Sequence, residues 1–316
     1  MAMKSYKGFD KKLKCRDFQY EIGKEYEMDG EIKVCSRGFH ACESPFDVFD
    51  HYTMIDSRFC EVEQDGNISK EDRGTKICSS KIKIKAELKL ADMINLGVEW
   101  LKEITSPEKI KTSIKDNSFG YGAQIGSSGD DAKIGSSGNN AKIGSSGYGA
   151  QIGSSGDGAQ IGSSGYNAQI GSSGDGAKIG SSGNNAKIGS SGNGAKIGSS
   201  GDDAKIGSSG DDAKIGSSGD DAQIGSSGNG AQIGSSGYGA QIDSTGEDCV
   251  IMCAGINSVA KASKGSWITL SEWSYSDKKQ RYIPVCVKTE FVDGKKIKAD
   301  TYYSLKGGVF VESVNN

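Results

Sequence analysis

The sequence predicts a mainly β protein, with a central β-solenoid of nonapeptide repeats between a small α+β N-terminal domain and a small β-rich C-terminal domain. Composition gives the first reason: 47 of the 316 residues are glycine and only 3 are proline, whereas average proteins contain about 7% glycine. The second reason is a nine-residue repeat that runs from residue 126 to residue 242 without an insertion. We therefore expect domains at residues 1–116, 117–260 and 261–316.

Three runs in the N-terminal domain have the composition of β-strands, at residues 18–22, 58–63 and 81–85. In the last run Ile82 and Ile84 alternate with lysines, and this period of two is typical of a strand with one buried face. The three runs predict a small sheet.

Two helices are expected beside this sheet. One starts near Ser44 and Pro45 and turns Phe46, Val48 and Phe49 toward the core. The other spans residues 90 to 104, where large apolar residues recur at helical spacing. We expect one shared face for Met93, Leu96, Trp100 and Leu101.

The repeat reads Gly-Ser-Ser-Gly-x-x-Ala-(Lys/Gln)-Ile thirteen times, so 26 of the 47 glycines stand at fixed positions. Side chains alternate across a strand, so Ala132 and Ile134 should point inward and Lys133 outward. We expect the glycines to supply the positive-φ positions of the turns. Collagen is excluded by the period and the scarcity of proline. A flexible Gly/Ser linker would not keep Ala and Ile in fixed phase.

Two repeats should form each turn of the solenoid, because nine residues are too few to close a turn around a core. A looser copy at residues 117–125 and two degraded copies at 243–260 bring the array to 144 residues, or eight turns of 18. At a strand spacing of about 4.8 Å the rod would be about 38 Å long, with rows of Ile facing rows of Ala inside. Tyr148 should then stack on Tyr166. The pairs Asp202-Asp203 and Asp220-Asp221 should lie one turn apart.

Calcium and ice are the two ligands that the repeat itself suggests. Calcium β-rolls carry an Asp at the sixth position, but only four of the thirteen regular copies do, so water-facing turns are favoured over a calcium site. Those four are Asp131, Asp203, Asp212 and Asp221. The serine rows that begin at Ser127, Ser136 and Ser145 would suit ice binding if they formed an outward hydroxyl ladder, but Ser next to Gly is also ordinary turn chemistry. Lys and Gln mix at the eighth position, which argues against nucleic-acid binding by the rod.

The C-terminal domain has strand-like runs at residues 267–270 and 282–285. Hairpin turns are expected at residues 292–294 and 306–308, where Asp-Gly and Gly-Gly occur. Because a solenoid has unpaired strand edges at its ends, both end domains should cover them.

One cluster of metal-ligating residue types occurs in the N-terminal domain. Cys15, Cys35, His40 and Cys42 could supply four zinc ligands, although their spacing is not that of a zinc finger and cysteine is often a buried apolar residue. His40 and His51 are the only histidines. A catalytic pair of Cys42 with either histidine is an alternative, and core packing is the other.

The chain has no apolar run of about 18 residues, which excludes a membrane helix, and its start lacks the apolar segment of a signal peptide. These features predict a cytoplasmic protein with mostly reduced cysteines. No P-loop, Gly-x-Ser-x-Gly or His-Glu-x-x-His motif is present.

Five segments resemble a family of uncharacterised bacteriophage and prophage proteins, in which a GFHACE-type N-terminal domain precedes a Gly/Ser-rich repeat array and a small β-rich C-terminal domain. The segments are residues 6–10, 18–24, 38–43, 265–273 and 292–303. The resemblance implies a viral origin and a bacterial cytoplasmic setting. The Gly-Phe-His of residues 38–40 also resembles ADP-ribosyltransferase-like folds, although no catalytic Glu can be placed.

Three functions follow as hypotheses. The first is a non-catalytic phage binding or scaffold protein, in which the solenoid spaces two small domains. The second is an anti-defence protein that sequesters a host nucleotide-type immune signal or inhibits a host protein. The third is an N-terminal enzyme that acts on a nucleotide. No cofactor beyond the zinc and calcium candidates is expected, and a homo-oligomer is compatible with all three. The candidate ligand-binding residues are His40, Tyr148, Tyr166, Trp267 and Trp273.

Overall fold

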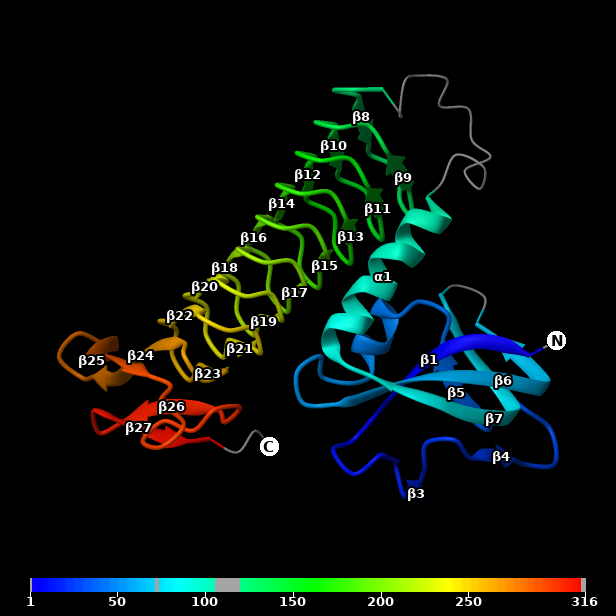
Figure 1. The fold of residues 1–316 in the computed structure, drawn as a ribbon, viewed down its shortest axis with the longest axis horizontal. Helices are drawn as coiled ribbons and strands as arrows, with labels where there is room; N and C mark the ends of the chain where they lie inside the picture. Colours follow the sequence, from blue (N-terminus) through cyan, green and yellow to red (C-terminus); the bar gives the residue numbers. More distant parts are fainter. Residues whose placement is uncertain (1, 72–73, 106–119, 314–316) are drawn as a thin grey trace. The chain divides into compact units, whose positions relative to one another are not determined.

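The structure is a computed structural model that describes residues 2–71, 74–105 and 120–313 (Figure 1). It is mainly β and divides into two compact units, Met1–Trp100 and Leu101–Asn316. The predicted boundary between residues 116 and 117, like the start of the loose repeat at residue 117, lies outside the described residues.

The N-terminal unit is built on a five-stranded sheet with the order β4-β7-β5-β1-β6. Strands β6 and β7 also pair with each other, so β6, β7, β5 and β1 close into a ring. Phe9, Val62, Ile82 and Ile84 are buried in its core. The elements are β1 (Met3–Phe9), β2 (Lys14–Cys15), β3 (Phe18–Gln19), β4 (Glu25–Glu27), β5 (Phe39–Cys42), the 3-10 helix η1 (Phe46–Asp50), β6 (Arg58–Lys70), β7 (Lys76–Leu88) and α1 (Leu90–Ile104).

Most predicted elements of this unit are confirmed. The runs 58–63 and 81–85 lie in β6 and β7, and η1 buries the three predicted apolar residues, although it is a 3-10 helix. The run 18–22 is wrong beyond Gln19, because the chain turns there and buries Tyr20 in the core.

Helix α1 has the predicted bounds, and two of the four residues expected on its buried face, Met93 and Leu101, are fully buried. The other two, Leu96 and Trp100, are only half-buried, whereas Ile94 and Val98 are buried. The physical reason is Gly97, which lies in the middle of the buried stripe, where an added Cβ would overlap the ring of Phe46. The close approach of these two elements shifts the buried stripe from Leu96 and Trp100 toward Ile94 and Val98.

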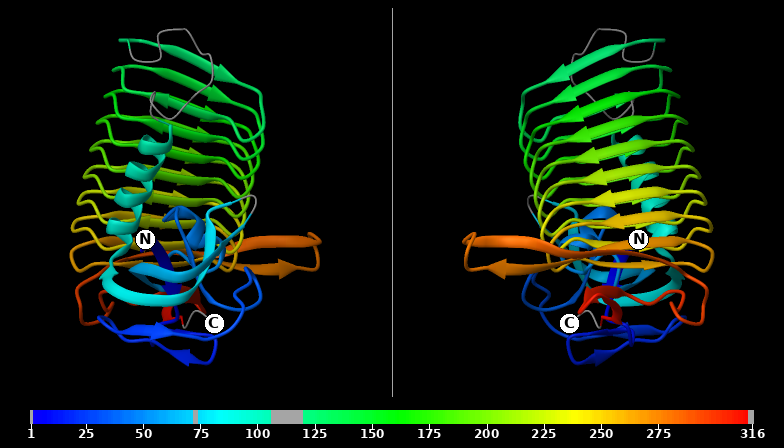
Figure 2. Two further views of the ribbon diagram at one scale, coloured as in Figure 1. Left: turned by 90° about the vertical axis from the view of Figure 1, so that its right-hand side faces the viewer. Right: turned by 90° about the vertical axis from the view of Figure 1, so that its left-hand side faces the viewer.

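Sixteen strands of four residues each form the solenoid, and they alternate between two parallel sheets. Each residue pairs with the residue 18 positions further on, as in Ile143 with Ile161 and Ile152 with Ile170. Two repeats per turn and about eight turns are therefore confirmed, and Figure 2 shows the turns stacked one above the other.

We call the sheet that starts at β8 the first sheet and the sheet that starts at β9 the second. The solenoid strands of the first sheet are β8 (Gln124–Ser127), β10 (Lys142–Ser145), β12 (Gln160–Ser163), β14 (Lys178–Ser181), β16 (Lys196–Ser199), β18 (Lys214–Ser217), β20 (Gln232–Ser235) and β22 (Val250–Cys253). Those of the second are β9 (Lys133–Ser136), β11 (Gln151–Ser154), β13 (Gln169–Ser172), β15 (Lys187–Ser190), β17 (Lys205–Ser208), β19 (Gln223–Ser226), β21 (Gln241–Ser244) and β23 (Val259–Ala262).

The interior of the solenoid contains the predicted rows of Ile and Ala, and also a row of Ser. Ile152 and Ser154 are both fully buried, because residues two apart in a strand point to the same side. The serine ladder that would suit ice binding therefore does not face solvent. The structure therefore contradicts the ice-binding alternative for these rows, because their hydroxyls fill the narrow interior.

The sequence suggested that the invariant glycines supply the positive-φ positions of the turns, but the structure places positive φ at another position of the repeat. The residues with positive φ are the sixth residues of the repeat, which are always Gly, Asn or Asp and whose φ runs from 53° at Asp131 to 70° at Gly122. These three residue types tolerate the left-handed region best. The four Asp residues considered as calcium ligands thus have a backbone reason to be there.

The fifth residues of the repeat form a ladder along each edge. The carboxylate of Asp202, for example, accepts a hydrogen bond from the backbone N–H of Asp220, one turn on, at 3.0 Å. Burial and the neighbouring Asp203, Asp220 and Asp202 carboxylates raise the pKa of Asp221. The predicted cluster of aspartates on adjacent turns is therefore confirmed.

The C-terminal segment continues both sheets of the solenoid. Strand β24 (Trp267–Ser276) pairs in parallel with β22 and then forms a hairpin with β25 (Arg281–Phe291). Strand β26 (Tyr303–Lys306) pairs with β23 and forms a hairpin with β27 (Val309–Glu312). These hairpins cover this end of both sheets, and the predicted strands and the turn at 306–308 are confirmed.

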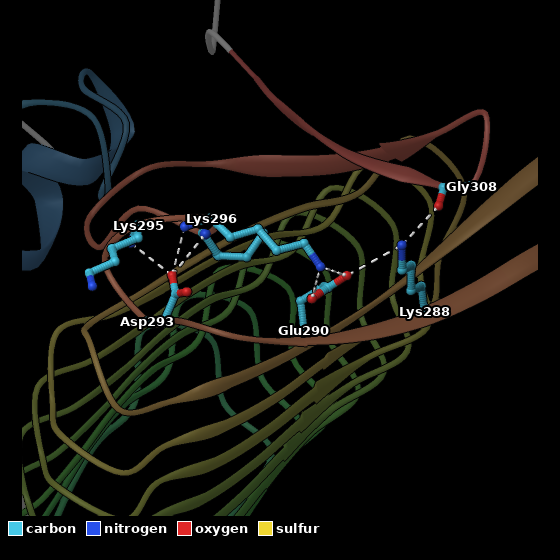
Figure 3. A network of polar contacts seen from close by, with 7 residues as sticks. Lys288, Glu290, Asp293, Lys295, Lys296 and Gly308 are labelled. Atoms are coloured by element: carbon cyan, nitrogen blue, oxygen red, sulfur yellow. Dashed lines mark hydrogen bonds and ion pairs between the residues drawn. The ribbon is translucent and has the colours of Figure 1, made fainter.

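The predicted hairpin turn at residues 292–294 is wrong, because β25 turns back on β24 through residues 277–280 instead. Asp293 begins a loop, and its carboxylate accepts hydrogen bonds from the backbone N–H groups of the three following non-glycine residues at 2.7 to 3.1 Å (Figure 3). Nearby, Lys296 pairs with Glu290 at 2.7 Å, and Lys288 donates to the carbonyl of Gly308. The hydrogen bond from Lys288 attaches the turn between β26 and β27 to β25, and the other contacts hold the loop after β25 to that strand.

Within the part of the chain that the structure describes, no helix is long and apolar enough to cross a membrane.

Candidate functional site

The N-terminal unit contains a cavity of about 950 Å³ that gathers most of the residues singled out in the sequence. Its walls come from β1, β4 and β5, from the loops that follow β2 and β4, and from the segment after η1. Gly8 in β1 allows Tyr52 into the wall, because an added Cβ would overlap the tyrosine ring.

Lys7 is the charged group buried in this wall, with 5% of its surface exposed. Its ammonium donates to the carbonyl of His40 at 2.9 Å and to Sγ of Cys15 at 3.5 Å. The rings of Phe9 and Tyr20 lie 5.4 and 5.7 Å away. No carboxylate among the described residues lies within ion-pair distance of Lys7. Burial lowers the pKa of the Lys7 ammonium, so a bound anion would relieve an uncompensated charge.

Cys15 lies between two hydrogen-bond donors. Besides Lys7, the hydroxyl of Tyr52 donates to its sulfur at 2.9 Å. Burial raises the pKa of Tyr52, so its phenol stays protonated and remains a donor at neutral pH. The sulfur of Cys15 thus fixes the positions of the lysine and the tyrosine.

His40 lies on β5 beside the same lysine. Its Nε2 accepts a hydrogen bond from the backbone N–H of Cys35 at 3.0 Å. Burial lowers the pKa of His40, and the charges of Lys7, Lys76 and Arg16 lower it further. The imidazole is therefore neutral at pH 7, and three cations make this end of the cavity electropositive.

Three carboxylates also line the cavity, at Asp17, Glu25 and Glu27. Lys81 pairs with Glu25 at 2.8 Å and lies 3.9 Å from Glu27. The charge of these two glutamates is thus partly balanced by a lysine of their own, whereas the lysine at residue 7 has no such partner.

Aromatic rings form a third part of the wall. Phe18, Tyr20 and Tyr26 contact one another edge to face, with ring centroids 4.7 to 5.3 Å apart. Phe18 is 47% exposed although it contacts both tyrosine rings. Its free surface is suited to a planar ring of a ligand.

Backbone strain is concentrated around the cavity. Leu13, Arg16 and Cys35 have φ values of 62°, 55° and 65°, and such values cost about 1 kcal/mol or more in residues other than Gly, Asn and Asp. Arg16 and Cys35 line the cavity. Strained residues of this kind are frequent at binding sites, where the fold holds side chains in place for a ligand.

The four zinc candidates all line this cavity but do not form a metal site. No three His, Cys, Asp or Glu side chains are arranged to hold a metal ion anywhere in the described residues. Nε2 of His40 already accepts the N–H of Cys35, and Cys15 already accepts two donors. The structure therefore brings Cys15, Cys35, His40 and Cys42 together around an electropositive cavity and does not support zinc at this site among the described residues.

The other candidate ligand residues belong to the second unit. Tyr148 and Tyr166 stack as predicted, with centroids 5.7 Å apart and planes at 14°. Their hydroxyls accept hydrogen bonds from the amides of Asn167 and Asn185 on the next turns. These contacts give the tyrosines a structural role along the edge of the solenoid.

The two tryptophans differ from each other. Trp267 is 47% exposed and lies against Phe291 at 5.0 Å. Trp273 donates its indole N–H to the carbonyl of Ala254 and to Ser271, so it holds the end of the solenoid together. The structure does not bring either tryptophan near another predicted site residue of its unit.

Lys7, Arg16 and Tyr52 were missed by the sequence analysis. The sequence contained one signal, at Lys7. This lysine alternates with Ser5 and Phe9 along β1, and the side chains of Ser5, Lys7 and Phe9 are all buried. Recognising it required knowing that residues 3–9 form a strand with this row inside.

Comparisons with known proteins bear on the same unit. A family model described as Domain of unknown function (DUF7666) matches residues 3–96. No curated protein and no solved structure matches the chain.

Proposed function

We propose that the protein is a non-catalytic binding protein, in which the N-terminal unit captures a small anion with a planar ring, such as a nucleotide, and the solenoid is a rigid scaffold. The observation that carries this proposal is Lys7. Its ammonium is buried in the wall of a large cavity without a carboxylate partner among the described residues. A buried cation without a counter-ion destabilises the empty domain, so an anionic ligand is the group that the cavity lacks.

Two further features support a nucleotide-type ligand over a simple anion. Arg16 and Lys76 add positive charge beside Lys7, which suits a phosphate. Phe18 offers an exposed aromatic face in the same cavity, which suits a base. Sequestration of a host nucleotide signal by a phage protein, as the resemblance to phage proteins led us to expect, is one biological form of this proposal.

Release of the bound ligand tests the proposal. The full chain, purified from bacterial cells, is denatured by heat, and the released small molecules are separated by anion-exchange chromatography and identified by mass spectrometry. We expect an ultraviolet-absorbing anion from the wild type and none from Lys7→Met. Lys4→Met is the matched control, because Lys4 lies on the same strand but is exposed and pairs with Glu61 at 2.8 Å; it should retain the ligand.

Calorimetry with defined probes supplies the second measurement. AMP, ADP, a cyclic dinucleotide and inorganic phosphate are titrated into the ligand-free chain. We expect at least one nucleotide to bind more than about tenfold more tightly than phosphate, because the ring adds contacts with Phe18. Failure to release or bind any anion would refute the proposal. Recovery of a chemically altered probe would instead support the nucleotide-acting enzyme.

A further inference from the structure

The outer face of the first sheet carries a row of glycines that the fold does not require. An added Cβ would find nothing within 4 Å, and none of these glycines has a positive φ. They are Gly126, Gly144, Gly162, Gly180, Gly198 and Gly216. Alanine would fit at each position and would suit a strand better, so the local structure does not explain why all are glycine.

This glycine row is the floor of a long trough. Two hollows of about 780 and 620 Å³ meet at Lys196 and together extend from Gln124 to Met252 along the face. Six steps of about 4.8 Å separate Gly126 from Gly234, so the trough is about 29 Å long. A row of Lys and Gln borders the glycines on one side, and the exposed third residues of the repeats, which are Ser as at Ser146, border them on the other. The Cα atoms of these two rows are about 13 Å apart, because four residues of extended strand separate them. This separation is comparable to the diameter of an α-helix, about 10–12 Å.

The first two corresponding glycines of the second sheet, Gly135 and Gly153, already lie against the backbone at the C-terminal end of α1. At Gly135 an added Cβ would overlap the carbonyl oxygen of Thr105, and at Gly153 it would come within 3.3 Å of the carbonyl of Leu101. Leu101 and Thr105 are one helical turn apart and belong to the same unit as the solenoid. One helical turn rises about 5.4 Å and one solenoid turn about 4.8 Å, so a helix can follow the glycine row.

The trough is also positively charged. Lys142, Lys178, Lys196 and Lys214 line it, and none of them has an ion-pair partner in the described part of the chain. The last three occupy consecutive turns of the first sheet. The aspartates of the repeat stand at the turns and are absent from the strands of this face.

From these observations we propose that the trough is a docking surface for an α-helix of a partner protein that carries a stripe of acidic side chains. Carboxylates at i and i+4 of a helix are about 5–6 Å apart, which closely matches the spacing of lysines on consecutive turns. The helix backbone would lie on the glycine row, as the end of α1 does on the other face. This surface is independent of the cavity around Lys7.

The test uses the full chain and synthetic fluorescent peptides of about 20 residues, the length of helix that spans the trough. The probe is an Ala-based helix with Glu at i, i+4 spacing along one face. One control peptide has the same composition with Glu distributed around the helix, and another has a central Pro. We expect the striped peptide to bind at least about tenfold more tightly than both controls in fluorescence anisotropy.

Two variants locate the binding on the protein. Replacing Lys178, Lys196 and Lys214 by Gln removes the charge, and Gly180→Val with Gly198→Val fills the trough. Each should lower the affinity to that of the control peptides while circular dichroism remains unchanged. The matched control carries Lys278→Gln and Lys279→Gln in the turn between β24 and β25 and Lys295→Gln in the exposed loop after β25, and it should bind normally.

Several outcomes would overturn the proposal. Equal binding of all three peptides, or normal binding of the striped peptide by the Gly180→Val, Gly198→Val variant, would show that the peptide binds only through general surface charge. Tighter binding of single-stranded DNA than of the striped peptide would identify a nucleic-acid surface instead. A dimer in light scattering that the filled trough dissociates would show that a second copy of the chain covers this face.

Discussion

Each repeat contains two invariant glycines, and the structure gives them different physical reasons. At the fourth position the backbones of adjacent turns are so close that an added Cβ at Gly183 would overlap the carbonyl oxygen of Gly165. At the first position on the first sheet, an added Cβ at Gly180 would meet nothing within 4 Å. The two glycines are equivalent in the sequence and opposite in their tolerance of a side chain.

Alanine substitutions should separate them. Gly183→Ala should destabilise the solenoid by about 1–3 kcal/mol, because adjacent turns must move apart to admit the methyl group. Gly180→Ala should be neutral or stabilise by about 0.5 kcal/mol, because it restricts the unfolded chain. Thermal and urea unfolding of the two variants measures the difference, and equal losses of stability would contradict this account.

Lys7 leads to a second prediction at the residue scale. Lys7→Met should raise the stability of the ligand-free protein by about 1–3 kcal/mol, since a buried unpaired charge is replaced by an apolar side chain of similar length. Lys4→Met, at an exposed position, should change stability by less than about 0.5 kcal/mol. Calorimetric melting of ligand-free samples gives both values. A large loss of stability in Lys7→Met would mean that its bonds to His40 and Cys15 outweigh its desolvation.

At the scale of elements, carboxylates hold the parts of the C-terminal segment to one another, while strand pairing and a shared apolar core hold the segment to the solenoid. Glu272 accepts the backbone N–H groups of Gly307 and Gly308 at 2.8 Å. Backbone hydrogen bonds lower the pKa values of Glu272 and Asp293, and the hydrogen bond from Lys296 lowers that of Glu290. The packing of the two C-terminal hairpins against each other should therefore depend on pH.

A carboxyl whose pKa is lower in the folded than in the unfolded chain stabilises the fold at pH values above its unfolded pKa of about 4. This stabilisation is lost as the pH falls through the pKa of the folded chain. We expect the C-terminal hairpins to loosen below about pH 4, seen as a change in tryptophan fluorescence. The triple variant Glu272→Gln, Glu290→Gln, Asp293→Asn should lose most of this change in fluorescence between neutral and acid pH. An unchanged pH profile in that variant would show that other groups are responsible.

At the scale of the whole molecule, the solenoid has a period of 18 residues although its sequence repeats every nine. The two sheets end differently, because β24 continues the first and β26 closes the second. Deleting one full turn leaves β24 on the first sheet and β26 on the second. Deleting one repeat would instead place β24 on the second sheet and β26 on the first.

Deletions test this parity. Removing residues 180–197, one turn, should leave a folded and slightly less stable protein, because each turn contacts only its neighbours. Removing residues 180–188, one repeat, should be much more damaging, because every later strand moves to the opposite sheet and the final hairpins meet the wrong ones. Circular dichroism and limited proteolysis compare the two. Equal stability of both deletions would mean that the hairpins are not specific for their sheets.

The sequence by itself determined the solenoid, its two repeats per turn, the Ile and Ala interior and the stacking of Tyr148 on Tyr166. It could do so because a strict repeat converts a local pattern into neighbours 18 residues apart. It also indicated Cys15, Cys35, His40 and Cys42 as a group, but as zinc ligands.

Only the tertiary structure decided the rest. It turned the second-position serines inward, placed the positive φ at the sixth position, and separated the lysines of the faces from the aspartates of the turns. It also buried Lys7 beside His40 without a counter-ion among the described residues. The physical reason is common to these cases: burial, charge balance and close backbone approach depend on what lies opposite a residue, and outside a strict repeat the sequence does not say what that is.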